Sequence, residues 1–212
     1  MLILNTLPGI RSIPWAPRYF ARVTTLVLGL VSVGGAWADT TVLLLRHGEK
    51  PEAGLGQLNC QGLNRALALP AVLARYGTPK AIFAPNPGVP KTDGGVPYHY
   101  VRPLATIEPY AIRQGLPVDL SYDMRETDAL AQRLLQGEGL QVVAWEHHLA
   151  VLVARQFLQL AGGDPTQVPV WSNDDFDGVY VLHYAGPSGG QAARVDFHRE
   201  AEGLNGLPAD CP

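Results

Sequence analysis

Short apolar runs alternate with longer amphipathic segments through most of the chain. The apolar runs are 41–45, 80–84, 116–120 and 140–145. Runs of this length are typical of strands that are covered on both faces of a sheet. The segments between them have helical spacing, and each ends at or near a glycine; they are 59–76, 102–114, 127–136 and 149–160. This order predicts an α/β fold, a three-layer sandwich in which helices flank a mostly parallel central sheet.

Two stretches depart from the alternation. Residues 179–184 and 193–198 predict a closing hairpin around a glycine-rich turn. Residues 85–101 are rich in proline and glycine, which favours an irregular loop. Such a loop is either a lid that touches a ligand or a surface insertion. In the first case, the side chains within reach of a ligand would be Lys91, Tyr98, His99 and Tyr100.

Residues 1–38 have the pattern of a secretory signal peptide. Three arginines and no acidic residue come before an apolar run at 23–33, which is short for a membrane span. Small residues follow at Ala36 and Ala38, the positions that a signal peptidase reads. We predict cleavage before Asp39, which leaves 39–212 as a single catalytic domain that is secreted or periplasmic. An uncleaved membrane anchor is the alternative.

Removal of that segment changes the formal net charge from −3 to −6, because three arginines and no acid are lost. An acidic product of this kind excludes nucleic acid as a partner, and after cleavage we expect no membrane contact. Attraction for an anionic ligand must then come from a local pocket. The sequence carries no signal for an oligomeric state.

The chain has two cysteines, Cys60 and Cys211. In an oxidising compartment we expect them to form a disulfide that links the C-terminal tail to the first helix. Two free thiols are the alternative that the sequence leaves open.

Residues that suit phosphate chemistry follow two of the predicted strands. Arg46 and His47 come directly after the first apolar run, and His147 follows the last one. The carboxyl ends of parallel strands meet at one edge of a sheet, where ligands collect. A guanidinium pairs with phosphate oxygens, and a neutral imidazole nitrogen can attack phosphorus. Arg102, at the start of a predicted helix, can join them.

Phosphoryl transfer through such a set also needs a proton donor. Glu126 is the predicted acid, because it lies on a loop at the same sheet edge. Asp123, Glu49 and Glu146 are competing acids nearby.

Glu146, His147 and His148 form a possible metal site. Neighbouring residues at the end of a strand point in opposite directions, which argues against one ion binding all three. We therefore do not expect a metal site at these three residues. His148 also competes with His147 for the second imidazole position.

The motifs together resemble the histidine phosphatase superfamily, whose fold is phosphoglycerate mutase-like. The resemblance covers nearly all of 40–165. Its motifs are Arg46-His47-Gly48-Glu49, Leu58-Asn59 with Gly62, Arg102-Pro103-Leu104-Ala105-Thr106, the acid-bearing segment 116–126, and the strand with its histidine, 142–147. The chain departs from the family pattern at Pro103, where alanine is usual, and at His148, where glycine is frequent.

The resemblance implies a role for each matching residue. His47 would be the nucleophile that becomes phosphohistidine, and Glu126 would protonate the leaving oxygen and then activate water. The phosphoryl oxygens would be bound by Arg46, Arg102 and His147. The resemblance implies no metal and no organic cofactor. The function expected is an exported, metal-independent phosphatase that hydrolyses small phosphomonoesters. Alternatives are a phosphohistidine-protein or sugar-phosphate phosphatase of narrow specificity, and a non-catalytic module that binds a phosphorylated ligand.

Overall fold

The computed structural model describes residues 39–54, 56–93 and 95–212. The predicted signal peptide, 1–38, lies outside the described residues. A six-stranded sheet runs through the described part, in the order β5 (Val118–Asp119), β2 (Pro79–Phe83), β6 (Gly139–Trp145), β1 (Thr40–Arg46), β7 (Gly178–Ala185), β8 (Arg194–Ala201). The first four strands are parallel to one another, whereas β7 is antiparallel to both β1 and β8.

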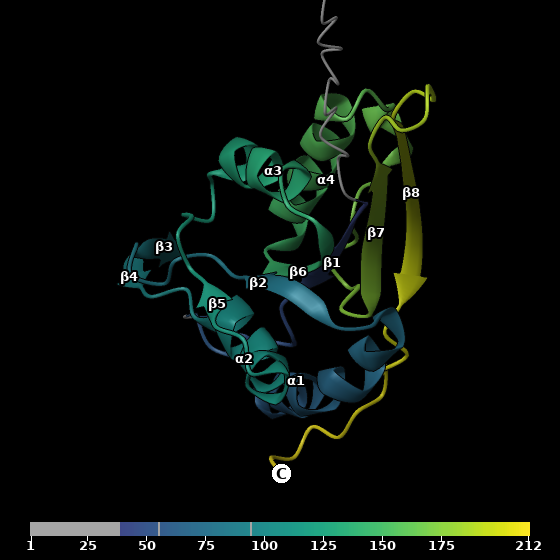
Figure 1. Ribbon diagram of the computed structural model, residues 1–212. Helices are drawn as coiled ribbons and strands as arrows, with labels where there is room; N and C mark the ends of the chain where they lie inside the picture. Colours follow the sequence, from purple (N-terminus) through teal and green to yellow (C-terminus); the bar gives the residue numbers. More distant parts are fainter. Residues whose placement is uncertain (1–38, 55, 94) are drawn as a thin grey trace, which may run out of the picture. The chain divides into compact units, whose positions relative to one another are not determined.

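Four α-helices cover the sheet: α1 (Cys60–Leu73), α2 (Arg102–Gln114), α3 (Thr127–Leu135) and α4 (His147–Leu160). Figure 1 shows α1 and α2 on one face, and α3 and α4 on the other. Short 3₁₀ turns follow two of them, at Ala74–Tyr76 and Pro165–Gln167. The predicted three-layer α/β sandwich with a mostly parallel sheet is confirmed. Within the described residues, none of the helices has the length and hydropathy needed to cross a bilayer.

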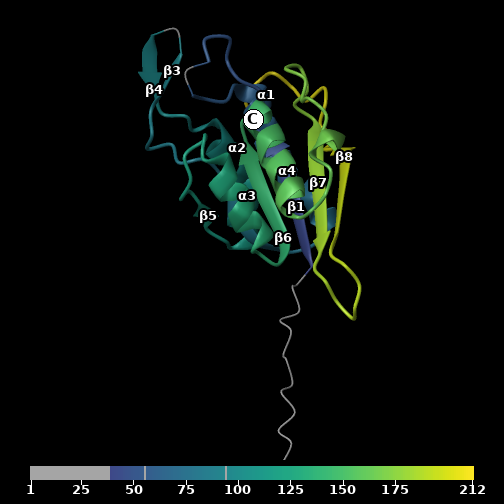
Figure 2. The same ribbon diagram turned by 90° about the horizontal axis from the view of Figure 1, so that it is seen from above.

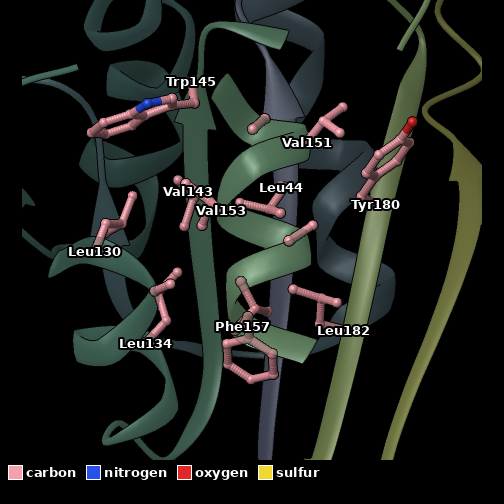
Figure 3. Packing of buried hydrophobic residues seen from close by; sticks show 14 of the residues in the cluster. Leu44, Leu130, Leu134, Val143, Trp145, Val151, Val153, Phe157, Tyr180 and Leu182 are labelled. Carbon is pink, nitrogen blue, oxygen red and sulfur yellow. The ribbon is translucent and has the colours of Figure 1, made fainter. Parts of the chain in front are cut away.

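Strand β1 is buried on both faces, as its apolar run predicts. Its side chains alternate between the two layers because successive residues of a strand point to opposite faces. Leu43 and Leu45 pack in the core under α1 and α2, and Val42 and Leu44 pack in the core under α3 and α4. Figure 3 shows Leu44 in this second core, beside side chains of α3, α4 and β7.

The structure departs from the predicted elements at three places. The loop 85–101 contains a small hairpin, β3 (Lys91–Asp93) paired with β4 (Val96–Tyr98), so it is not wholly irregular. Figure 2 shows this hairpin beyond the end of the sheet at which β1 finishes. The third apolar run gives a strand of only two residues, β5, and α4 begins at His147 rather than at 149. The early start of α4 is stabilised by Glu146, whose carboxylate accepts a hydrogen bond from the Leu149 amide.

A disulfide joins Cys60 to Cys211, which confirms the predicted pairing. It links the first residue of α1 to the second-last residue of the chain, across 151 positions. The tail is held beside α1 by Asn64 as well, whose side-chain amide donates to the carbonyl oxygens of Pro208 and Asp210. The irregular C-terminal tail therefore belongs to the same layer as α1.

Candidate active site

The register of β1 and β6 brings the two predicted histidines to one sheet edge. Arg46 stands opposite Trp145, and the amide of His47 donates to the Trp145 carbonyl oxygen at 3.2 Å. His147 follows two residues later, at the start of α4. Both imidazoles line the same cleft, which has a volume of about 580 Å³.

The structure brings four of the five predicted site residues into this cleft. These are Arg46, His47, Arg102 and His147, hereafter the inner set, and all four are buried. The fifth, Glu126, is exposed and does not line the cleft. The rest of the lining comes from the loop after β1, the 85–101 loop, the loop before α3, and Glu146.

His47 is held as a neutral imidazole. Its pKa is lowered to about 3, chiefly by burial and also by the neighbouring guanidiniums of Arg102 and Arg46, while the contact with Gly48 acts in the opposite direction. Its Nδ1 lies 2.7 Å from the Gly48 carbonyl oxygen. A ring that donates from Nδ1 to this carbonyl has an unprotonated Nε2, which is the atom that can attack phosphorus.

Arg46 is positioned by the loop that leads into β7. Its Nη1 donates to the carbonyl oxygens of Asn173 at 2.6 Å and Asp175 at 2.9 Å. The ring of Phe176 stacks on the guanidinium, with the ring centroid 3.7 Å from Cζ. These partners orient the guanidinium but carry no full negative charge, so its positive charge stays available to an anion.

Arg102 is also held by a backbone carbonyl and an aromatic ring, but it belongs to the helix α2. It is the first residue of α2, and its Nη1 donates to the Gly54 carbonyl oxygen at 2.9 Å. The ring of Tyr100 lies below it, 4.8 Å from Cζ to the centroid. Within the described residues, neither guanidinium of the inner set has a carboxylate within ion-pair distance.

Both ring nitrogens of His147 face oxygen atoms. Nδ1 lies 2.7 Å from a carboxylate oxygen of Glu146, and Nε2 lies 2.8 Å from the side-chain oxygen of Asn173. Nε2 is hydrogen-bonded to Asn173, whereas Nδ1 is close to the carboxylate without the geometry of a hydrogen bond. Burial acts to raise the pKa of Glu146, but the contact with His147 and the hydrogen bond from the Leu149 amide lower it to about 2. Glu146 is therefore an anion that orients His147 rather than a proton donor.

The loop that carries His47 is fixed by close packing. Gly48 does not have a positive φ, so the sharp turn that glycine allows is not its purpose here. Instead, a Cβ on Gly48 would lie 2.9 Å from Cα of Gly62 in α1. The Gly48 amide also donates to Thr106 Oγ1 of α2 at 2.9 Å. The glycines of the first two motifs and the threonine of the third thus meet at one contact.

The predicted acid, Glu126, is turned onto its own loop. Its carboxylate accepts a hydrogen bond from the Asp123 amide at 2.6 Å. Of the competing acids, Asp123 lines the cleft and pairs with Lys91 at 2.7 Å. Although partial burial opposes it, that hydrogen-bonded pair with Lys91 lowers the pKa of Asp123. Glu49 points away, into an ion pair with Arg65 at 2.7 Å.

The geometry of Glu146, His147 and His148 differs from the geometry that the sequence predicts. They follow the end of β6 and begin α4, so they do not alternate as residues in a strand do. One ligand atom from each lies within 4.8 Å of the others. The directional reason for excluding a metal is therefore wrong. His148 is exposed and does not line the cleft, which leaves His147 as the second imidazole of the site.

Sequence reasoning missed the residues that support the inner set. Asn173, Asp175 and Phe176 lie in the loop before β7. They contact Arg46, and Asn173 also contacts His147, because the antiparallel pairing of β7 places its first residue beside the end of β1. A single sequence does not show whether two strands pair in parallel or antiparallel. Arg65, whose helix face the sequence leaves unassigned, is fully buried and bonded to Glu49, Asp177 and Glu202. A charged residue between apolar helix positions is the signal that could have indicated its burial.

No protein-family model and no curated protein matches the chain in sequence. Solved structures that overlap its fold include the following three. A mycobacterial glucosyl-3-phosphoglycerate phosphatase with inorganic phosphate has 14% identity and a TM-score of 0.49, with 75% of this chain and 95% of that chain covered. A protein histidine phosphatase, SixA, with tungstate has 13% identity and a TM-score of 0.46, with 77% and 97% covered.

The third structure is a protein from Nakamurella multipartitia assigned as a phosphohistidine phosphatase, SixA. It has 15% identity and a TM-score of 0.47, with 77% of this chain and 97% of that chain covered. Overlaps at these TM-scores support no inference about activity. The function proposed below therefore depends on the residues and geometry of this chain.

Proposed function

We propose that the protein is an exported phosphatase that hydrolyses small phosphomonoesters through a phosphohistidine on His47. One observation carries the proposal: the free Nε2 of a neutral imidazole faces a cleft lined by two uncompensated guanidiniums and a second imidazole. A nucleophile and several cationic donors around one point are what phosphoryl transfer requires. Arg46, Arg102 and His147 would bind the three non-bridging oxygens.

The reaction would have two steps. In the first, Nε2 of His47 forms a bond to phosphorus as the bond to the ester oxygen breaks, and the alcohol leaves with a proton. In the second, water attacks the phosphohistidine, loses a proton to a base, and releases inorganic phosphate and free His47. Each step keeps the phosphoryl charge among the same cations, so positioning and neutralisation supply most of the catalysis.

The proton-transfer group is a separate part of the proposal. Asp123 is ionised and lines the cleft, which suits the base of the second step. Glu126 would need to leave its hydrogen bond with the Asp123 amide to reach a leaving group. We therefore propose Asp123 as the base and keep Glu126 as the acid implied by the family resemblance.

Export is proposed together with the activity. The disulfide between Cys60 and Cys211 supports it, because disulfides persist in oxidising compartments. A leader at 1–38 followed by a single catalytic domain, 39–212, agrees with that setting. Metal independence is also proposed, since the inner set offers cationic groups where a metal would otherwise neutralise the phosphate.

Turnover of p-nitrophenyl phosphate in the presence of EDTA tests the proposal. Wild type should release p-nitrophenol, and His47→Ala should not. His198→Ala is the matched control, because His198 is exposed on β8 outside the cleft. No turnover of this ester or of a panel of small phosphate esters would favour a binding module. Loss of activity with EDTA would contradict the metal-free mechanism and direct attention to the Glu146, His147 and His148 cluster.

A further inference from the structure

A second group of cations stands at the mouth of the cleft, outside the inner set. Lys50 and Arg125 line the cleft but are exposed, and Lys91 is half-buried. We call these three residues the outer rim. The difference in burial divides the cleft into a closed inner part and an open outer part.

The positive charge of the cleft exceeds what one phosphoryl group needs. Five cationic side chains and two carboxylates, Asp123 and Glu146, line the cleft, while a bound phosphate monoester adds about −1.5 to −2 at neutral pH. In the outer rim, Lys91 is already paired with Asp123 at 2.7 Å. Within the described residues, Lys50 and Arg125 have no carboxylate within ion-pair distance. Lys50 and Arg125 therefore stay without a carboxylate partner at the mouth, and the cleft keeps about one positive charge beyond those that the bound phosphate and its own carboxylates balance.

The two free cations approach the mouth from different strands. Lys50 lies in the loop after β1, and Arg125 in the loop after β5. In the sheet, β2 and β6 separate β5 from β1, so the two chain segments are about 14 Å apart at their strands. Both side chains nevertheless line one cleft. Because the inner set is buried and the outer rim is more exposed, a leaving group attached to a phosphoryl group in the inner set would extend toward the outer rim.

We propose that the leaving group of the natural substrate carries a second anionic group, a carboxylate or a further phosphate, which binds the outer rim. The inference rests on the proposed function and narrows its substrate class. A neutral leaving group would leave Lys50 and Arg125 without partners. An anionic group would gain electrostatic attraction in a partly enclosed cleft, where charges are screened less than on an open surface.

Binding of two matched phosphonates tests the proposal without requiring turnover. Phenylphosphonate and 4-carboxyphenylphosphonate differ only in the second anionic group, and neither is hydrolysed. At low ionic strength, calorimetry should show the carboxylated ligand binding about fivefold to tenfold more tightly to the wild-type protein, and the preference should shrink with added salt. A wild type that shows this preference but hydrolyses no ester would overturn the hydrolase and leave the second-anion site standing.

The double variant Lys50→Gln and Arg125→Gln should bind both phosphonates equally. Its matched control is Lys80→Gln with Arg113→Gln, which removes one lysine and one arginine that are exposed outside the cleft and should keep the full preference. Three results would each overturn the proposal: equal affinities in the wild type, no binding of either ligand, or a preference that survives in the double variant.

Discussion

Gly62 and Glu49 pack so closely that a Cβ on Gly62 would lie 2.3 Å from the Glu49 carbonyl oxygen. The contact joins the first turn of α1 to the residue two positions after His47. Glycine at position 62 therefore sets how close the histidine loop can come to the helix, and with it the direction of the imidazole.

Replacement of Gly62 by alanine should displace the histidine loop. We expect a loss of about 1–3 kcal/mol in unfolding free energy, because the backbone of Glu49 must move to admit a methyl group. Activity should fall more than stability implies, since His47 moves with the loop. Denaturant unfolding and kcat measured on one preparation check this. Leu67→Ala, on an exposed position of the same helix, should change neither. A fully active Gly62→Ala would show that the contact does not position His47.

Arg65 is the only cation among three carboxylates beneath the histidine loop, in the part of the chain that the structure describes. It bonds to Glu49, Asp177 and Glu202 and is fully buried. Removal of the guanidinium would leave buried anions unpaired, so Arg65→Met should cost about 3–5 kcal/mol of unfolding free energy. Arg75→Met is the matched control. Arg75 forms a solvent-exposed pair with Glu200, and its loss should cost less than about 1 kcal/mol. Equal effects of the two substitutions would contradict this account.

The same cluster makes stability depend on pH. The pKa of Glu202 is raised to about 7, chiefly by burial and also by repulsion from Asp177 and Glu49, while Arg65 opposes the shift. Because the folded protein holds this proton more tightly than the unfolded chain, the contribution is complete below about pH 4.5 and is lost as the pH rises through 7.

Glu202→Gln should remove this dependence while keeping an acceptor for Arg65. Between pH 5 and 8, the wild type should lose about 2 kcal/mol more than the variant in unfolding free energy. His47, whose pKa is lowered, acts in the opposite direction, but it is present in both proteins and cancels in the difference. If the unfolding free energies of the two proteins change with pH by the same amount, Glu202 does not titrate in this range.

Esters with different leaving alcohols distinguish the proposed roles of Asp123 and Glu126. If Asp123 is the base of the second step, Asp123→Asn should lower kcat about 100-fold for every ester alike, and phosphoenzyme should accumulate. Asparagine keeps the hydrogen bond that the Asp123 side chain accepts from the Arg125 amide, so the loop should survive. Glu126→Gln should lower kcat by a factor that grows with the pKa of the leaving alcohol, because Glu126 is kept as the acid of the first step. A Glu126→Gln variant that keeps the wild-type kcat for every leaving alcohol would contradict this role.

The sequence predicts much of the fold because most strands and helices have continuous local patterns. The apolar run of β1 and the Gly115 stop of α2 are such signals, and α2 begins and ends where they predict. The start of α4 was predicted two residues late, because His147 and His148 carry no apolar signal and their helix begins through the Glu146 cap.

The inner set is predictable for a related reason. Each of its residues lies directly at the end of a strand or the start of a helix, so local order and the rule for parallel sheets place them together. The supporting residues are not predictable in this way. Asn173 reaches His147 across 26 positions, and Arg65 reaches Glu202 across 137. Such contacts depend on the direction of each strand and on which face each helix turns to the core, and neither can be read from one sequence.

Rapid-quench labelling tests the central claim most directly. The protein is mixed with a ³²P-labelled ester for milliseconds, quenched, and the labelled residue is identified by peptide mapping. We expect an acid-labile, base-stable label on His47 that appears before inorganic phosphate and is absent from His47→Ala. A label on His148 or on a carboxylate, or phosphate release with no labelled protein at any time, would contradict the phosphohistidine mechanism.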